Sequence, residues 1–328
     1  MKWLSGSTAL LLISIAFATQ ARAANPEHVK QLLQTKECKG CDLSNARLKG
    51  ASLKGANLEG ANLEGVYLYK AYLVDANLSR ANVKSADLGD SNMQGINFSG
   101  SDLTNTNLKG NDMTGANLEN ANLSEAILEC NQRNRTKLGY ANLKKANLSN
   151  ANLKGVWLQG ANLAGADLNY ADLSPDTAES GRTIYTIYSN VSGANLSDAN
   201  LSDTNLYRAI FFRANLNNAK LTDANLNDAY LVMAQLRGAN LMKASLREAN
   251  LQRANLSNAN LSNADMVKSK LVDANLTNAI LKSTRLVDIN MSGANLMGAD
   301  ISGAEMRKNK LCRVTMPDGT KTEESCDK

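Results

Sequence analysis

The sequence predicts an all-β solenoid, a parallel β-helix with four-sided coils. One five-residue word, Ala-(Asn/Asp)-Leu-x-x, repeats without a spacer, as it does from Ala249 to Met266. A period of five fits neither a helix nor a flat strand, because either would spread the leucines over several sides. The chain must therefore turn a corner in every word, so that four words close one coil. Each Leu, with the Ala two positions before it, then points inward.

The repeated word resembles that of the pentapeptide-repeat proteins, and the resemblance extends over most of the chain. Members of this family form a right-handed four-sided β-helix, and the resemblance implies the same architecture here. Together with the export signal described next, it is similar to exported bacterial members of the cyanobacterial periplasm or thylakoid lumen. The repeat serves proteins of unrelated function, so the family alone indicates no activity.

Residues 1–23 are typical of a secretory signal peptide. Lys2 precedes an apolar run from Ala9 to Ala18, and Ala21-Arg22-Ala23 forms a small-residue cleavage site. This run is too short to span a bilayer, which takes about 20 residues, so a membrane anchor is the less favoured alternative. We expect cleavage after Ala23, export to the periplasm or thylakoid lumen, and no stable membrane insertion of the mature protein.

Residues 24–42 predict a short helix that covers the first coil, where strand edges and leucines would otherwise be open. Asn25-Pro26-Glu27 supplies the N-cap, proline and acid of a helix start. Three apolar side chains then fall on one helical face: Val29, Leu32 and Leu33. His28 has no metal-binding or catalytic partner nearby in the sequence, so we expect it at the surface without a chemical role.

Cys38 and Cys41 form a C-x-x-C motif for which three roles are open. A redox dithiol would need a βαβ context, and zinc would need about four ligands, whereas the other cysteines lie far along the chain. In an oxidising compartment, a disulfide that ties the helix to the first coil is favoured. Cys41 occupies the Ala position before Leu43, so its side chain should point into the core.

The predicted β-helix extends over residues 43–311 and is interrupted first at residues 130–136. There Arg133 occupies a word centre, although Leu138 resumes the same register. An arginine cannot lie unpaired in this core, so we expect the segment to bulge outward. The functional alternative is a polar loop made for contact.

The second interruption is the insertion at residues 174–192. The word centres on either side, Leu173 and Leu196, lie much further apart than one word, so nearly all of this segment counts as extra. The insertion contains the apolar cluster Ile184-Tyr-Thr-Ile-Tyr188. We expect it to pack back on the solenoid, and a domain boundary is the alternative.

Counting coils of four words assigns both interruptions to one column of centres, which runs Leu73, Met93, Met113, Arg133, Leu153, Leu173, Phe211 and Leu231. Outward residues near the insertion are apolar, and a stacked apolar group is typical of an interaction surface. The expected protein-contact face comprises Arg133, Arg135, Tyr185, Tyr188, Ile210, Phe212, Tyr230 and Val232. We expect the insertion itself to cover the last four of these.

Residues 312–328 predict a hairpin lid around the turn at Pro317-Asp318-Gly319. A Cys312–Cys326 disulfide would close about 15 residues and contribute about 3 kcal/mol in the chain-entropy account. Cys130 is then left over at an outward position, where a free thiol and an intermolecular bridge, and with it a homo-oligomer, are both open.

No catalytic, cofactor-binding or metal site is predicted, because Leu and Ala fill the interior and the polar residues are spread by the repeat. This argues against a polysaccharide-cleaving β-helix. A DNA-mimicking topoisomerase inhibitor would need a strongly acidic surface, whereas the net charge is +5 before signal removal. Nucleic-acid binding would need a clustered basic stripe. We therefore expect an exported, non-catalytic scaffold that binds an unidentified protein.

Overall fold

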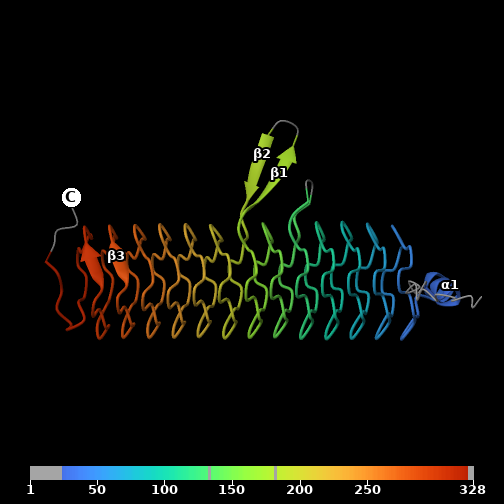
Figure 1. Cartoon of the computed structure of the whole chain (residues 1–328), viewed down its shortest axis with the longest axis horizontal. Coiled ribbons are helices and arrows are strands. Elements are labelled where there is room, and N and C mark those ends of the chain that lie inside the picture. The colour runs from blue at the N-terminus through green and yellow to red at the C-terminus, as the bar shows by residue number, and fades with distance from the viewer. Residues whose placement is uncertain (1–23, 132–133, 181–182, 324–328) are drawn as a thin grey trace, which may run out of the picture.

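The computed structural model describes residues 24–131, 134–180 and 183–323, which form a rod of stacked coils (Figure 1). Parallel β-bridges join each coil to the next, as Asn57 pairs with Asn77 and Asn77 with Asn97. The Leu and Ala side chains of successive words make one continuous buried core. A β-helix-type solenoid is therefore confirmed, while the right-handedness implied by the family resemblance stays a prediction.

Each corner of a coil is a four-residue turn. At the corner formed by residues 43–46, the Ala46 amide donates to the Leu43 carbonyl at 3.0 Å. The third residue of the turn has a positive φ, as at Asn45 (58°) and Gly60 (63°), which is the pattern of a type II turn. Glycine and asparagine tolerate this left-handed conformation best, so they recur at the last position of the word.

Outward asparagines form a second ladder along one side of the rod. The Asn97 side-chain amide donates to Oδ1 of Asn77 at 3.1 Å, and Asn117 donates to Asn97 at 3.2 Å. The ladder continues through Asn142, Asn162, Asn195 and Asn215. An amide side chain can donate and accept at once, which explains why asparagine suits a position that stacks on itself.

Helix α1 (Pro26–Thr35) lies at the N-terminal end of the rod (Figure 1). Its N-cap is Asn25, whose Oδ1 accepts the Glu27 amide at 3.0 Å. Leu32 is buried against the first coil, but Leu33 is 46% exposed. The prediction that both share the buried face is wrong for Leu33, because consecutive helical residues point about 100° apart and one side of α1 meets the coil.

Two contacts tie α1 to the first coil. Nδ1 of His28 accepts the Asp42 amide at 3.0 Å, so this histidine has a structural contact. Cys38 and Cys41 are both buried and form a disulfide with an S–S distance of 2.08 Å, as predicted. Among the described residues, no cluster of His, Cys, Asp and Glu could hold a metal ion.

The first interruption is a loop outside the repeat and not an irregular word. Asp112 pairs with Lys137, one word later than the usual spacing between coils, so Met113 stacks on Leu138. The column assigned from the sequence, in which Arg133 followed Met113, is therefore wrong. One word's length of chain is looped out because a charged side chain would be costly among buried leucines. Arg133 itself lies outside the described residues.

The second interruption is a β-hairpin, and the insertion is one word shorter than predicted. Trp157 pairs with Asn190, so the solenoid resumes before Leu196, at a word that the sequence assigned to the insertion. Val191 is the centre of this additional word, with buried Ser189 in its Ala position. The antiparallel hairpin consists of β1 (Asp176–Ser180) and β2 (Thr183–Ile187).

The hairpin projects away from the rod (Figure 1). Ile184 and Tyr185 are 68% and 52% exposed, so the prediction that the insertion covers the neighbouring apolar residues is wrong. Pairing between β1 and β2 satisfies the backbone groups on their facing edges, and the outer edges of an exposed hairpin can hydrogen-bond to water, so the insertion can form without packing on the solenoid. The β-bridges between coils continue past the hairpin, as between Asn162 and Asn195.

The C-terminal coils contain β3 (Arg285–Val287) and β4 (Glu305–Arg307), which pair in parallel. Beyond them Thr315 pairs with Lys321 in the predicted antiparallel hairpin. Cys312 is buried and disulfide-bonded, as predicted. Its predicted partner Cys326 lies outside the described residues, so that pairing stays a prediction. In the part of the chain that the structure describes, no helix has the length and apolar character needed to cross a membrane.

Candidate docking surface

Both interruptions leave the rod at one corner, on the same side (Figure 1). The slot loop, residues 130–135, follows the coil position of Leu128, and the hairpin follows that of Leu173 two coils later. They do share one side of the molecule, although the column assigned from the sequence is wrong. We call the face that begins at this corner the docking face. Its outward residues, in stacking order, are Lys137, Trp157, Asn190, Ile210 and Tyr230.

Arg135 joins the slot loop to the hairpin. Its Nε donates to the Gly155 carbonyl at 2.6 Å and its Nη2 to the Val156 carbonyl at 3.1 Å. The Nη2 group also donates to the carbonyl of Tyr188, where the hairpin returns to the rod. Burial lowers the pKa of Arg135, but an arginine stays charged in a protein. This residue, predicted as a contact residue, is thus half-buried and clamps three segments together.

Cys130 lies at the base of the clamp as a buried free thiol, 6% exposed. A Cβ on Gly155 would lie 2.8 Å from its Sγ, 3.0 Å from Asp176 and 3.2 Å from Ile187, so glycine is required where these groups converge. Burial, and then the charge of Asp176, raise the pKa of Cys130 to about 11. The expectation of an outward position is wrong because the hairpin base closes over the thiol.

We expect Cys130 to resist alkylation in the folded protein. The thiolate is the reactive form, and with a pKa of about 11 only about one molecule in a thousand carries it at pH 8. Intact mass after iodoacetamide treatment, with and without denaturant, measures this difference. Equal alkylation rates in the two conditions would show that the thiol is accessible.

The slot loop also reaches back to Asp90, two coils nearer the N-terminus. Asn134 Nδ2 donates to Asp90 Oδ1 at 3.1 Å, Asn131 donates to the same oxygen, and the Tyr69 hydroxyl donates to Oδ2 at 2.7 Å. Burial raises the pKa of Asp90, but these three hydrogen bonds outweigh it and lower the pKa overall. The Asp90 carboxylate is therefore an anchor for the loop.

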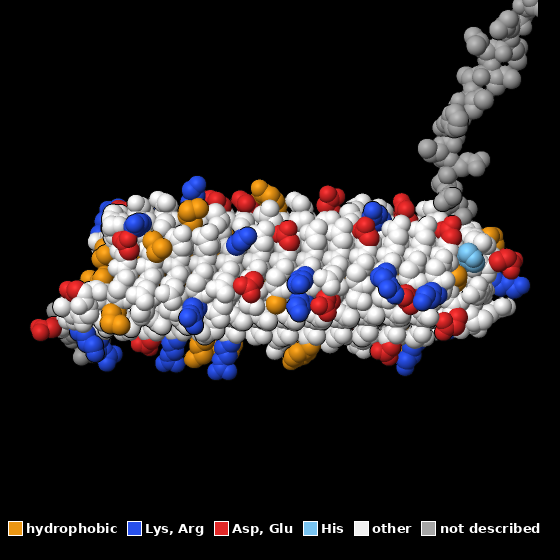
Figure 2. Space-filling model, turned by 90° about the horizontal axis from the view of Figure 1, so that it is seen from below, with side chains coloured by type: hydrophobic (Ala, Val, Ile, Leu, Met, Phe, Trp, Pro, Cys, Tyr) orange, Lys and Arg blue, Asp and Glu red, His pale blue; other side chains and the backbone are white. Residues whose placement is uncertain are grey.

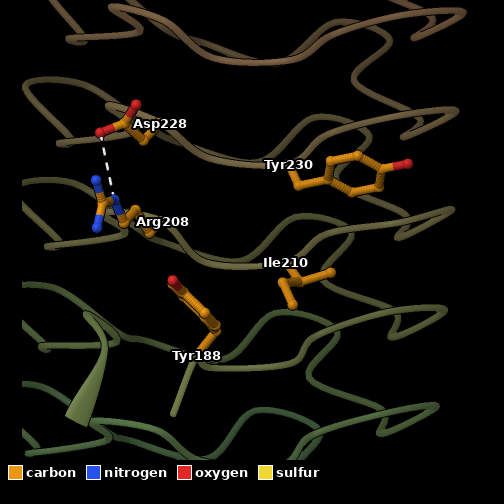
Figure 3. Close-up of a pocket in the computed structure, with 5 residues that line it drawn as sticks. All are labelled: Tyr188, Arg208, Ile210, Asp228 and Tyr230. Atoms are coloured by element: carbon orange, nitrogen blue, oxygen red, sulfur yellow. Dashed lines mark ion pairs between the residues drawn. The ribbon is translucent and has the colours of Figure 1, made fainter. Parts of the chain in front are cut away.

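An apolar groove lies on the C-terminal side of the hairpin (Figure 3). Tyr188, Ile210 and Tyr230 line it, and its volume is about 490 Å³. The Nε of Arg208 lies 3.5 Å from Oδ2 of Asp228 at its edge. Both tyrosines are exposed, so the groove is open to a partner.

The structure brings together half of the predicted contact residues: Tyr188, Ile210, Phe212 and Tyr230. Tyr185 lies apart on the projecting hairpin, and Val232 is only 9% exposed and lines a different hollow with Met233 and Arg253. Trp157, 37% exposed and one coil before Asn190, was missed. Counting the insertion as one word shorter would have placed this tryptophan on the docking face.

The side of the rod opposite the hairpin differs in character. Acidic and basic side chains are interspersed there, and apolar side chains are scattered (Figure 2). Mixed charge of this kind gives no extended field of one sign. The grouped aromatic residues are therefore a feature that this opposite side does not share.

A family model described as pentapeptide repeats matches most of the chain. The matched segments are residues 41–80, 56–95, 91–129, 134–163, 146–174, 189–228, 209–248, 219–258, 244–282 and 274–308. Residues 130–133 and 175–188 fall between these matches, at the slot loop and the hairpin. No curated protein sequence matches the chain.

Solved structures of pentapeptide-repeat proteins are similar to the chain. HetL from Nostoc sp. strain PCC 7120, involved in heterocyst differentiation regulation, is 28% identical, with 92% of this chain and 100% of HetL covered and a TM-score of 0.26. A thylakoid-lumen protein from Arabidopsis thaliana is 28% identical over 32% of this chain and 66% of its own, with a TM-score of 0.20. QnrB1, a plasmid-mediated fluoroquinolone resistance protein, is 20% identical over 70% and 87%, with a TM-score of 0.26.

Proposed function

Because the chain belongs to the pentapeptide-repeat family, we propose that it is an exported, non-catalytic scaffold that binds another protein through the docking face. One observation carries the proposal: the slot loop, the hairpin and the aromatic groove converge on one side, where Arg135 joins the first two. A plain rod needs none of these features. With residues 1–23 as the signal peptide, the site of action is the periplasm or the thylakoid lumen.

The composition of the docking face supports a protein partner. Trp157, Tyr188 and Tyr230 are all exposed on it, and aromatic side chains are enriched where protein surfaces bind. Ile184 and Tyr185 are exposed on the hairpin beside them. A two-stranded hairpin is marginally stable alone, so a partner that covers these side chains would also stabilise it.

Photo-crosslinking in the native compartment tests this function. A crosslinkable residue at Trp157, Tyr188 or Tyr230 should capture the same protein from each position, while exposed control sites at Lys54 and Asn258 should not. The captured protein, once purified, should bind the unmodified chain and lose affinity for Tyr230→Ser. If the three test positions capture nothing beyond the controls, the docking face is wrong.

A further inference from the structure

We propose that the groove on the docking face takes an extended acidic segment of the partner protein, anchored by one aromatic or aliphatic side chain. This inference rests on the proposed function and adds the chemistry of the partner. It follows from residues 207–213, which lie one coil beyond the point where the hairpin returns to the rod, and from the shape of the surface around them.

Arg208 lines the groove, and Arg213 lies beyond it next to Phe212, whose ring centre is 6.4 Å from that of the lining residue Tyr230. The guanidinium carbon of Arg208 lies 5.0 Å from the Tyr207 ring centre, and that of Arg213 lies 5.0 Å from the Phe212 ring centre. Arg208 occupies the corner before the outward residue Ile210, and Arg213 occupies the corner after it. Stacking on a ring holds a guanidinium in place and leaves its N–H edge open to a carboxylate.

The two charged residues that line the groove, Arg208 and Asp228, balance each other, so the net charge near it comes from Arg213 beyond its lining. Asp228 forms an ion pair with Arg208, whereas no carboxylate of a described residue forms one with Arg213. Tyr188, Ile210 and Tyr230 line the rest of the groove and carry no charge. The surface is therefore apolar with a net positive rim. A segment with a carboxylate on the Arg213 side of an apolar side chain complements it, because Arg208 already pairs with Asp228.

The shape favours an extended segment over a flat folded surface. The hairpin projects from the rod (Figure 1), and its second strand ends at Ile187, directly before the groove-lining residue Tyr188, so the hairpin borders the groove. A flat surface would meet the hairpin before it reached Ile210, whereas a single strand can pass along its base. A volume of about 490 Å³ also suits a few side chains of such a strand.

Selection from a random heptapeptide library displayed on phage tests the inference with the full mature chain as bait. Selected peptides should carry Asp or Glu on one side of an aromatic or aliphatic residue, the side that meets Arg213. With the enriched peptide labelled for fluorescence polarisation, Arg213→Gln should weaken binding about fivefold and Tyr230→Ala about tenfold. Arg253→Gln is the matched control, because Arg253 lies at the same corner two coils on and pairs with Asp273 at 3.6 Å.

Each outcome decides the inference. Enrichment of basic or uncharged peptides, no enrichment, or equal affinity for the wild type and Arg213→Gln would overturn it. A dimer of the chain that dissociates in Tyr230→Ala would make a second copy the occupant, which also overturns it. If the crosslinking experiment still captures a partner, the proposed function survives while the acidic segment is ruled out, so the two failures are distinguishable.

Discussion

Leu256→Asp should lower the free energy of unfolding by about 4 kcal/mol, whereas Gln252→Asp should change it by less than about 0.5 kcal/mol. Leu256 is fully buried in a column of leucines, because its coil pairs through Asn255 and Asn275 with the next. Gln252 lies one word earlier on the outward side of the coil, where it is half-buried. The introduced carboxyl is therefore buried in the core at position 256 and accessible to water at position 252.

The pH dependence of Leu256→Asp gives a second measurement. Burial raises the pKa of a carboxyl, so the unfolded chain ionises at lower pH than the folded one. The loss of stability should then grow as the pH rises above about 4, the pKa of an unperturbed Asp, and be smaller below it. Urea unfolding of both variants at pH 4 and pH 7 checks this. Equal loss for the two variants would contradict the assignment of inward and outward positions.

The coil could be predicted from the sequence because each word closes its own corner. The Ala46–Leu43 hydrogen bond and the positive φ at Asn45 both belong to one four-residue turn, so they depend on residues that are adjacent in the sequence. A five-residue repeat therefore predicts the turn geometry of each corner directly. The same argument holds for the C-x-x-C disulfide, whose cysteines lie within one turn of the chain.

The alignment of coils across the interruptions could not be predicted in the same way. The slot loop adds the length of one word, so Leu138 keeps the same period whether the loop is inside or outside the coil. Val191 was not recognised as a centre because Ser189 and Val191 replace the usual Ala and Leu. A period reports spacing along the chain, whereas stacking depends on which residues are looped out.

The candidate site was predicted in part for the same reason. Ile210 and Tyr230 both follow the interruptions, where the counting is regular again, and they lie on one face as expected. Trp157 lies between the interruptions and was placed on another face. The Arg135–Tyr188 contact joins residues far apart in the sequence, and no repeat encodes it.

Arg135→Met should lower the free energy of unfolding by about 3 kcal/mol. The guanidinium is the donor to the carbonyls of Gly155 and Val156, both buried residues, and to that of Tyr188. Methionine keeps much of the apolar stem but donates no hydrogen bond, so buried acceptors would be left without this partner. Arg253→Met removes an exposed ion pair with Asp273 and should cost at most about 1 kcal/mol.

Alkylation of Cys130 distinguishes loss of the clamp from general destabilisation. The thiol is covered at Gly155 by the base of the hairpin, which Arg135 holds through the Tyr188 carbonyl. In Arg135→Met the hairpin base should open more often than the whole solenoid unfolds. Cys130 should then react with iodoacetamide faster than the global free energy of unfolding of this variant predicts. Leu256→Asp, far along the rod, provides the comparison at similar loss of stability. If Cys130 is equally protected in the two variants, the clamp does not hold the hairpin, and the docking face would lose its fixed border.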